Sequence, residues 1–381
     1  MKTIKSKLPN VGTTIFTVMS QMANDNDAIN LSQGFPDFDC DKHLKSLVNY
    51  YIKNGYNQYA PMAGIPELRS VLSKKIKKLY GRNYDPETEI TITAGATQAI
   101  YTAISAIVSI GDEVIIFTPA YDCYESAIKL NGGLTKHVRL SYPDYTINFE
   151  KLKKAITKKT KAIIINSPHN PSGSILNRKQ MLELQRTLKG TDIILISDEV
   201  YEHIIFDGEE HQSVARYPDL FKRSIIVSSF GKTYHNTGWK MGYCYAPQGL
   251  MKEFRKVHQF NVFCVNRPLQ HAFSDYINDD KSHLSLSKFY QKKRNYFLKK
   301  IASSRFKPLP CSGTYFQLLD YSSISKDKDV DFAKQLVEEA GVAAIPVSVF
   351  YKRPPSSKVL RFCFAKNKKT LDQGAEILCS L

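Results

Sequence analysis

One lysine, Lys232, stands where it could act as a nucleophile. It follows the apolar run 225–229 almost directly, in the order Ser-Phe-Gly-Lys, and the segment 230–245 is rich in aromatic residues and glycine and contains the only tryptophan. A lysine held in such surroundings loses hydration of its ammonium group, so its pKa falls and the neutral amine can serve as nucleophile and base. In a chain with so many lysines, a solvated surface side chain is the alternative.

Polar side chains follow four other apolar runs at the same point, where each run ends. Open parallel sheets bind ligands beyond the carboxyl ends of their strands, so we expect these segments to face one crevice. The five segments are Ala94–Thr97, Thr118–Tyr121, Asn166–Gly173, Ser197–Tyr201 and Ser228–Lys232. Together they would bring a phosphate-type turn, an aromatic ring, an Asn, an Asp and a Lys to one site.

Two of these segments indicate a specific chemistry. Gly95-Ala96-Thr97 opens a predicted helix, where free backbone N–H groups and the helix dipole make an anion site. Asp198 follows a fully apolar strand, and a buried carboxylate needs a cation there, such as a protonated pyridine nitrogen. Tyr201 lies one helical turn further along, on the same face. The alternatives are an ordinary helix start and an Asp that caps the next helix.

The elements that must position these residues form an α/β pattern. Short runs rich in Ile and Val alternate with helical stretches, and the runs are apolar on both faces, as buried parallel strands are. The expected strands are 90–93, 114–117, 162–166, 193–197 and 225–229, with helices over 97–109 and around 179–188. The pattern therefore predicts a large domain with a mostly parallel sheet flanked by helices.

The last hundred residues predict a smaller α+β domain. A long polar helix near 282–303 precedes expected strands at 314–320, 342–346 and 359–364, with a helix near 329–340. The first 45 residues are expected to pack with this part of the chain. The predicted division is a large domain over 46–281 and a small discontinuous domain made of 1–45 and 282–381.

Composition argues against several classes of protein. The formal net charge is +17, with lysine clusters at 74–78, 151–161 and 292–300, yet no aromatic-interleaved basic motif or helix-turn-helix pattern accompanies them. Nucleic acid is therefore not expected as a partner, although the positive charge would favour anionic small ligands. The lysines of the first cluster are expected on the solvated face of a helix whose apolar stripe includes Leu68, Leu72 and Ile76.

The cysteines and the hydropathy pattern indicate the cellular compartment in which the protein is expected. Seven scattered cysteines without a Cys-x-x-Cys favour reduced thiols over a disulfide framework, and no metal site is expected. No apolar stretch approaches the ~20 residues that span a bilayer. The N-terminal residues lack the apolar run of a secretory signal. The prediction is a cytoplasmic protein that has no membrane partner.

The chain resembles the fold type I pyridoxal-phosphate enzymes and, within them, the class I/II aminotransferases. The resemblance rests on the segments Leu31–Phe38, Asn57–Ala60, Thr93–Thr97, Asn170–Gly173, Ser197–Tyr201 and Ser228–Trp239. The segment centred on Lys232 is the most specific. The similarity is greatest to the methionine and aromatic aminotransferases and to the kynurenine aminotransferase (glutamine transaminase K) type. It implies the fold type I architecture for the predicted α/β domain.

The resemblance implies a role for each residue of the cofactor site. Lys232 would carry pyridoxal 5′-phosphate as a Schiff base, Asp198 would keep the ring nitrogen protonated, and Tyr121 would stack on the ring. The remaining implied contacts are Asn170 and Tyr201 at the phenolic oxygen, and Gly95, Ala96, Thr97, Ser229 and Lys240 at the phosphate. Many members have arginine where this chain has Lys240, which keeps the charge and loses the forked hydrogen bonding.

The substrate side of the site is implied in the same way. Arg361, in the sequence Leu-Arg-Phe-Cys-Phe, matches the arginine that binds the substrate carboxylate through a planar, two-pronged guanidinium. Asn166 would lie near it. The implied substrate-binding set is Gly34, Asn170, Arg361, Phe16 and Tyr121. Tyr59 matches a tyrosine that reaches the phosphate of the neighbouring subunit, which implies a homodimer with shared active sites.

The implied activity is amino-group transfer from a methionine, aromatic, histidine or glutamine type of amino acid to a 2-oxo acid, in a ping-pong cycle. Lys232, Asp198 and Tyr201 form the implied catalytic set. Phe263 and Phe350 are further candidates for an aromatic pocket wall, and Arg267 is a candidate cation near the neighbouring site. The alternative is a pyridoxal-phosphate cysteine-conjugate C–S β-lyase, which shares the fold and the lysine and releases pyruvate.

Overall fold

A seven-stranded sheet forms the centre of the larger part of the molecule. The computed structural model describes residues 4–381, and the strand order in this sheet is β2-β8-β7-β6-β5-β3-β4. The strands are β2 (Ile90–Thr93), β3 (Glu113–Thr118), β4 (Leu134–Arg139), β5 (Thr160–Asn166), β6 (Ile194–Asp198), β7 (Ser224–Ser229) and β8 (Gly242–Tyr245). From β7 to β4 every neighbouring pair is parallel. The predicted α/β fold with a mostly parallel sheet is confirmed.

All five expected strands are present, with ends within two residues of the prediction. The parallel pairing expected for the first of them is wrong, because β2 pairs with the antiparallel strand β8. Since β8 also runs antiparallel to β7, β2 points in the same direction as β7. The carboxyl end of β2 therefore still lies at the same edge of the sheet as the other four. Sequence reasoning missed β8 and β4, and β4 is mostly half-exposed, so it carries no apolar run.

Helices cover both faces of this sheet. Alternate residues of β3 face opposite ways: Val114 and Ile116 join the core beneath α4, α5 and α10, whereas Ile115 joins the core on the other face. This alternation explains why the strands are apolar throughout. The helices of this part are α2 (Lys42–Lys53), α3 (Pro66–Tyr80), α4 (Gly95–Ile107), α5 (Cys123–Leu130), α6 (Phe149–Ala155), α7 (Arg178–Leu188), α8 (Pro218–Phe221), α9 (Phe230–Thr233), α10 (Gln248–Asn261) and α11 (Arg267–Tyr276), with 3₁₀ turns η1 (Val214–Arg216) and η2 (Thr237–Trp239).

The C-terminal part is built on a four-stranded antiparallel sheet in the order β12-β13-β10-β9. Its elements are α12 (Lys281–Leu284), α13 (Leu286–Lys300), β9 (Lys307–Pro308), β10 (Phe316–Asp320), α14 (Asp329–Gln335), the π-helical turn η3 (Leu336–Ala340), β11 (Val342–Ala343), β12 (Ile345–Pro346), η4 (Ser348–Phe350), β13 (Val359–Cys363) and α15 (Lys368–Ser380). The helix expected over 282–303 is divided into α12 and α13. The strand expected over 342–346 is divided between two sheets, because β11 pairs with β1 and β12 with β13.

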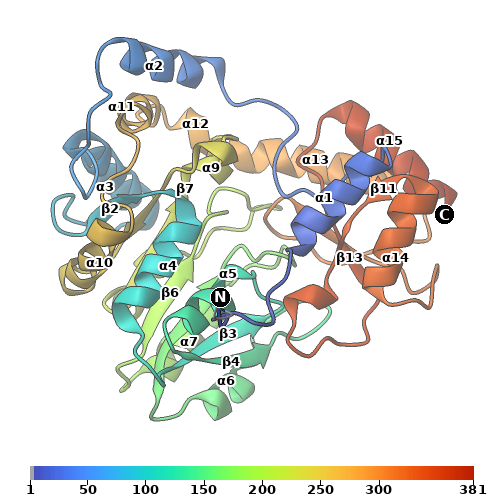
Figure 1. Cartoon of the computed structure of the whole chain (residues 1–381), viewed down its shortest axis with the longest axis horizontal. Coiled ribbons are helices and arrows are strands. Elements are labelled where there is room, and N and C mark those ends of the chain that lie inside the picture. Colours follow the sequence, from blue (N-terminus) through green and yellow to red (C-terminus); the bar gives the residue numbers. More distant parts are fainter. Residues whose placement is uncertain (1–3) are drawn as a thin grey trace.

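The N-terminal segment lies beside this C-terminal part. Strand β1 (Ile29–Asn30) pairs in parallel with β11, and α1 (Ile15–Asp25) packs on β11 and β12. Figure 1 shows α1 beside β11, with α13 running across from the larger sheet toward this smaller part. The predicted domain boundary at residue 46 falls inside α2, and the boundary at 281 falls at the start of α12. The division into two domains therefore remains a prediction.

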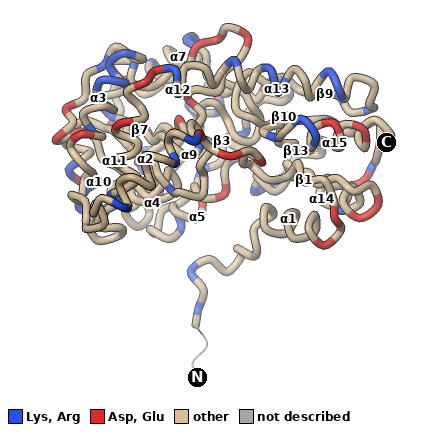
Figure 2. Tube along the Cα trace, turned by 90° about the horizontal axis from the view of Figure 1, so that it is seen from above, with Lys and Arg blue, Asp and Glu red and all other residues tan. Residues whose placement is uncertain are grey.

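The lysine cluster 74–78 differs from its prediction at one residue. Lys74, Lys77 and Lys78 are exposed, but Lys75 is buried, where its amine donates to Glu202 Oε1 at 3.2 Å and to the Tyr243 hydroxyl at 3.0 Å. The expectation of a fully solvated face is thus wrong for Lys75, because a carboxylate from the loop after β6 compensates its burial. Figure 2 shows basic and acidic residues distributed over both the larger and the smaller part of the molecule. All seven cysteines are free thiols.

Within the described residues 4–381, every helix is too short or too polar to cross a lipid bilayer.

Candidate active site

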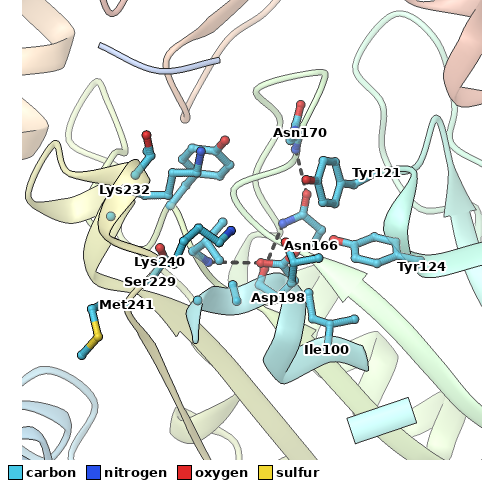
Figure 3. Close-up of a pocket in the computed structure, with 17 residues that line it drawn as sticks. Ile100, Tyr121, Tyr124, Asn166, Asn170, Asp198, Ser229, Lys232, Lys240 and Met241 are labelled. Atoms are coloured by element: carbon cyan, nitrogen blue, oxygen red, sulfur yellow. Dashed lines mark hydrogen bonds between the residues drawn. The ribbon is translucent and has the colours of Figure 1, made fainter. Parts of the chain in front are cut away.

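A cavity opens at the carboxyl ends of the strands, where the sequence predicts a site. Figure 3 shows its side chains converging from the ends of β5, β6 and β7 and from the start of α4. Ten predicted residues line it: Gly95, Ala96, Thr97, Tyr121, Asn170, Asp198, Tyr201, Ser229, Lys232 and Lys240. Asn166, which the sequence analysis expects near Arg361, also lines it, and the structure adds Ile100, Tyr124, Val200, Gly231, Thr237 and Met241.

Lys232 projects into this cavity from the short helix α9, which begins directly after β7. Phe230 anchors that helix, since its buried ring stacks on Phe273 with centroids 4.5 Å apart. The Lys232 amine lies 3.4 Å from the carbonyl oxygen of Gly34 and over the rings of Tyr201 and Tyr315, at 5.8 and 5.7 Å from their centroids. Burial lowers the pKa of Lys232 to about 8. The amine is therefore poised to act as a nucleophile or base near neutral pH.

Asp198 is a buried carboxylate with two hydrogen-bond donors and no ion pair to a cation in the described chain. Its Oδ2 accepts from the Tyr124 hydroxyl at 2.5 Å, and its Oδ1 accepts from the backbone N–H of Val200 at 3.3 Å. Burial raises its pKa to about 6, although both hydrogen bonds act in the opposite direction. A cationic ring nitrogen placed against Asp198 would relieve this desolvation.

Asn166 connects the loops that follow β5 and β6. Its side-chain amide donates to the backbone carbonyl of Asp198 at 3.0 Å, and its Oδ1 accepts from the backbone N–H of Asn170 at 2.8 Å. Asn170 in turn accepts a hydrogen bond from Arg361. One asparagine thus fixes the position of a second asparagine relative to the carboxylate.

The first turn of α4 forms the opposite end of the cavity. Its N-cap, Ala94, makes no side-chain cap hydrogen bond, and Gly95, Ala96 and Thr97 line the cavity, so backbone N–H groups of this turn are available to a ligand. Gly242 allows this approach, because a Cβ there would come within 2.9 Å of the carbonyl carbon of Gly95 and 3.1 Å of the nitrogen of Ala96. The Lys240 amine and the Ser229 hydroxyl line the same end. Backbone donors, a hydroxyl and an ammonium together suit a phosphate group.

Arg361, on β13, is 1% exposed and does not itself line the cavity, but it contacts Asn170, which does. Its Nη1 donates to Asn170 Oδ1 at 2.9 Å and its Nη2 to the carbonyl of Ser32 at 3.1 Å, while its buried Nε has no hydrogen-bond partner among the described residues. The guanidinium stacks 3.9 Å from the centroid of Phe316. A free donor on a buried cation is suited to a carboxylate ligand.

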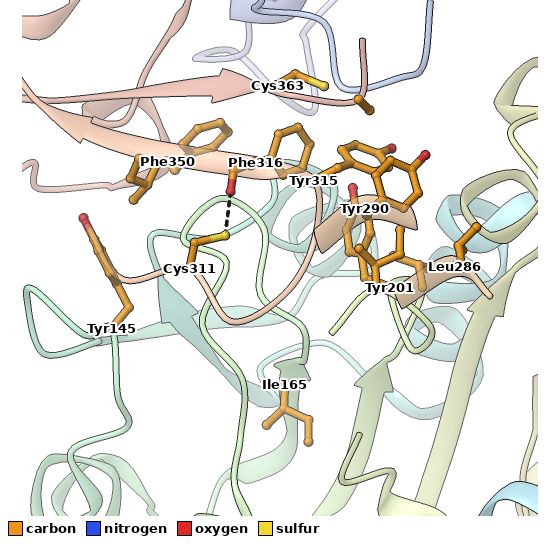
Figure 4. Close-up of a cluster of buried hydrophobic side chains, with 14 of the residues drawn as sticks. Tyr145, Ile165, Tyr201, Leu286, Tyr290, Cys311, Tyr315, Phe316, Phe350 and Cys363 are labelled. Atoms are coloured by element: carbon orange, nitrogen blue, oxygen red, sulfur yellow. Dashed lines mark hydrogen bonds between the residues drawn. The ribbon is translucent and has the colours of Figure 1, made fainter. Parts of the chain in front are cut away.

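Aromatic side chains enclose the guanidinium of Arg361. Phe16 and Phe350 lie 5.2 and 5.8 Å from it, ring centroid to guanidinium carbon. Gly34 keeps space beside it, since a Cβ would sit 3.0 Å from Phe316 and 3.9 Å from Nη2 of Arg361. Figure 4 shows Phe316, Phe350 and Tyr315 grouped along this side of the site.

Two tyrosines in the site were missed by sequence reasoning. Tyr124 bonds Asp198 and lies one helical turn after Tyr121, a spacing that could have identified it. Tyr315 is fully buried, and its hydroxyl donates to the carbonyl of Gly34 at 2.7 Å. No local signal marks Tyr315, because this residue, directly before β10, joins the site only through tertiary contacts.

Seven predicted residues do not line the cavity: Arg361, Gly34, Phe16 and Phe350 contact its lining residues or one another, and the other three are Tyr59, Phe263 and Arg267. Tyr59 is 78% exposed, and its ring packs edge-on against Phe263, which is 48% exposed. Neither lines the cavity, so Phe263 is not a wall of the pocket within one chain. Arg267 lies on α11, where it contacts His271 and the ring of Tyr56.

The arrangement can hold a flat aromatic ligand that carries a phosphate at one end and a protonated nitrogen on its ring. The first turn of α4 and Asp198 line the same cavity, Tyr121 offers an aromatic face, and Lys232 offers an amine. Arg361 lies beyond, where it would meet a carboxylate. This set suits chemistry at the carbon next to an amino acid carboxylate.

Comparisons with known proteins agree with this geometry. The family described as aminotransferase class I and II matches residues 26–378. A methionine aminotransferase of Escherichia coli K12 is 47% identical over 378 residues, which cover 99% of this chain and 98% of that protein. A kynurenine–oxoglutarate transaminase of Dictyostelium discoideum is 34% identical, over 97% of this chain and 94% of that protein.

Solved structures show the same relationship. The crystal structure of an E. coli protein with a methionine aminotransferase function superposes with a TM-score of 0.98, at 46% identity over 100% of both chains. The aspartate aminotransferase of Thermus thermophilus with maleate superposes with a TM-score of 0.91, at 28% identity over 100% of both chains. The chain is therefore an aminotransferase and belongs to the class I and II family.

Proposed function

We propose that the protein uses pyridoxal 5′-phosphate, bound through Lys232, to transfer the α-amino group of methionine or an aromatic amino acid to a 2-oxo acid. The observation that carries this proposal is the convergence in one cavity of an amine with a lowered pKa, an unpaired buried carboxylate and an anion-binding helix start. Histidine and glutamine are further candidate donors. The seven free thiols support a reducing, cytoplasmic location.

The residues present fit this cofactor at each of its functional groups. The start of α4, Ser229 and Lys240 would hold the phosphate, and Asp198 would hold the ring nitrogen in its protonated form. Tyr121 would cover one face of the ring, while Asn170 and Tyr201 would bond the phenolic oxygen. When bound, pyridoxal 5′-phosphate supplies an aldehyde that condenses with amines and a ring that withdraws electrons from the α-carbon.

The protein's own groups then have defined tasks. Arg361 would bind the substrate carboxylate and so aim the α-hydrogen toward Lys232. The Lys232 amine would accept the proton from the α-carbon and later return it, as a general base and then a general acid. The buried rings around Arg361 would exclude water from this step.

Binding of the cofactor to the apoenzyme is expected to depend on pH through Lys232. Only the neutral amine can attack an aldehyde, and its pKa of about 8 means that the neutral fraction rises through this pH. The rate of lysine–cofactor bond formation should therefore rise roughly tenfold per pH unit below about pH 8 and level off above it. Stopped-flow absorbance of apoenzyme mixed with pyridoxal 5′-phosphate measures this rate. A pH-independent rate would contradict the assignment of Lys232.

Tyr124→Phe is expected to move the acid limb of the pH profile of kcat/KM to higher pH. The hydroxyl of Tyr124 stabilises ionised Asp198, so its loss raises the pKa of Asp198 further. A hydrogen bond to a charged group is worth about 1.5–3 kcal/mol, which corresponds to about one to two pH units. Tyr84→Phe is the matched control, because the Tyr84 hydroxyl is buried without a partner in the described chain. An unchanged acid limb in Tyr124→Phe would remove this role.

The choice of substrate is supported by the pocket and by the relatives. A second cleft shares Tyr121 with the cofactor cavity, and we call it the outer cleft. Phe16, Tyr121 and Phe350 line it and give it an aromatic, apolar character, which suits a thioether or a ring. The methionine aminotransferase relative points the same way. A panel of amino acid donors with one 2-oxo acid acceptor tests the proposal, and methionine or an aromatic donor is expected to give the highest kcat/KM. Stoichiometric pyruvate from cysteine conjugates without an acceptor would instead favour a lyase.

We further infer a homodimer in which Tyr59 serves the neighbouring site. Tyr59, Phe263 and Phe260 leave apolar surface exposed, and Tyr59 does not line the cavity of its own chain. Sedimentation should give twice the mass of one chain. Tyr59→Phe should weaken retention of the cofactor by about tenfold, the value of one hydrogen bond to phosphate, whereas Tyr50→Phe should not. Equal retention in Tyr59→Phe and the wild type would contradict the shared site.

A further inference from the structure

A second concave site lies next to the substrate cleft and is lined mainly by cations. This basic recess has a volume of about 350 Å³, and its walls include Lys136, His137, Arg139, Lys352 and Arg353. Thr118 and Thr135 supply its remaining polar groups. None of these residues has a role in the proposed transfer reaction.

The fold brings the recess together from two distant parts of the chain. Thr135, His137 and Arg139 alternate along β4, so they share one face of this edge strand, and Thr118 of β3 is the register partner of Arg139. Lys352 and Arg353 come from the loop after η4. Arg139 connects the two parts, because its Nη2 donates to the backbone carbonyl of Arg353 at 2.6 Å.

Most of the positive charge in the recess is uncompensated. Lys136 pairs with Glu113 at 3.1 Å and His137 with Glu125 at 3.0 Å. Within the described chain, no carboxylate forms an ion pair with Arg139, Lys352 or Arg353. Like charges gathered in a concavity repel one another, and a bound anion would remove this repulsion.

The hydroxyl groups of the recess are shielded from bulk water. Thr118 is 4% exposed, and the Oγ1 of Thr135 is buried and lacks a hydrogen-bond partner among the described residues. Charged residues on an edge strand can serve simply to prevent sheet-to-sheet pairing. That explanation covers Lys136 but accounts neither for two cations from a separate loop nor for a buried unpaired hydroxyl.

The recess opens toward the substrate. Thr118, His137 and Lys352 also line the outer cleft, which contains Phe16, Tyr121 and Phe350. Tyr121 lines the cofactor cavity as well. Three residues of extended chain span at most ~11 Å, so Thr118 lies within about that distance of Tyr121.

We propose that the basic recess binds the carboxylate or phosphate group of a small anionic molecule beside the substrate entrance. Arg139 and Arg353 offer forked donors that match either group, Lys352 adds an ammonium, and the threonine hydroxyls complete the hydrogen bonding. The anion is either a free molecule or the distal group of a long substrate. The second source rests on the proposed aminotransferase function, whereas binding itself does not.

Calorimetric titration of the holoenzyme with inorganic phosphate at constant ionic strength tests the binding site. Arg139→Ala and Lys352→Gln should each weaken phosphate binding by about tenfold or more. Arg186→Ala is the matched control, since Arg186 is an exposed arginine on α7 that pairs only with Glu183 in the described chain. Undetectable binding to the wild type, or equal affinity in Arg139→Ala and Arg186→Ala, would overturn the proposal.

Kinetics with two kinds of acceptor distinguish the two sources. If the anion belongs to a substrate, Arg139→Ala raises KM about tenfold for a long-chain 2-oxo dicarboxylic acid and leaves KM for a 2-oxo monocarboxylic acid unchanged. If the anion is a free molecule, phosphate changes KM for both acceptors in the wild type and for neither in Arg139→Ala. A wild-type enzyme that transfers no amino group would refute the proposed function and leave the phosphate titration intact.

Discussion

Replacing Lys232 by alanine is expected to abolish amino-group transfer, with kcat reduced by about 10⁴-fold or more. The amine would lose both its bond to the cofactor and its proton transfer at the α-carbon, and a positioned general base alone contributes about 10²–10⁴-fold. Lys232 is the amine held among Gly34, Tyr201 and Tyr315, so no neighbouring lysine on α9 can replace it. Steady-state kinetics with methionine and a 2-oxo acid measure the loss.

Two further variants distinguish the reactivity of the Lys232 amine from its positive charge. Lys232→Arg keeps the positive charge, but a guanidinium stays protonated, so activity should not return. Lys307→Ala removes an exposed lysine on β9 and should match the wild type. Borohydride reduction should leave a cofactor label on the peptide that contains residue 232. A label on a different lysine, or activity retained in Lys232→Ala, would show that the assignment is wrong.

Arg361→Lys is expected to lower kcat/KM for amino acid donors by about 10–10²-fold. Hydrogen bonds to charged groups are worth about 1.5–3 kcal/mol, and a lysine at this position cannot supply the planar two-pronged contact. The contact depends on geometry as well as charge, because Asn170 and the carbonyl of Ser32 hold the two Nη atoms of Arg361 in place. Most of the change should appear in KM, since a carboxylate contact present before the reaction also persists in the transition state.

The burial of Arg361 calls for a control on folding. Its guanidinium stacks on Phe316 and is almost fully enclosed, so thermal unfolding and cofactor absorbance of Arg361→Lys should be compared with the wild type. A primary amine with the methionine side chain but no carboxylate supplies the chemical control. Wild type and variant should process that amine equally slowly. A variant that still prefers methionine over the amine as strongly as the wild type would refute the carboxylate role.

The candidate cofactor site could be predicted in outline because local sequence and fold class act together there. A parallel sheet places the carboxyl ends of its strands at one edge, so residues directly after each strand meet whatever the details of packing. Asp198 and Ser229 are the last residues of β6 and β7, Lys232 follows β7 by three residues, and all three line the cavity. The parallel pairing expected for β2 is wrong, but the predicted position of its carboxyl end is still right, because β2 runs in the same direction as β7.

Residues that reach the site through tertiary contacts were harder to predict. Tyr315 and Gly34 come from segments far apart in the chain, and only folding brings the Tyr315 hydroxyl to the Gly34 carbonyl. From the sequence, Lys75 is expected to be solvated like its neighbours. In the structure it is buried, and Glu202, from the loop after β6, compensates its burial. The basic recess likewise depends on the contact between Arg139 and the loop at Arg353.

The sequence by itself determined that Lys232 stands at a strand end among groups able to hold a flat, phosphorylated ring. It did so because strand patterns and the residues that follow them are local features. The tertiary structure decided which groups surround that lysine, how far burial lowers its pKa, and that Tyr124 rather than a cation holds Asp198. Those properties depend on desolvation and on distances between segments remote in sequence, which no local pattern encodes.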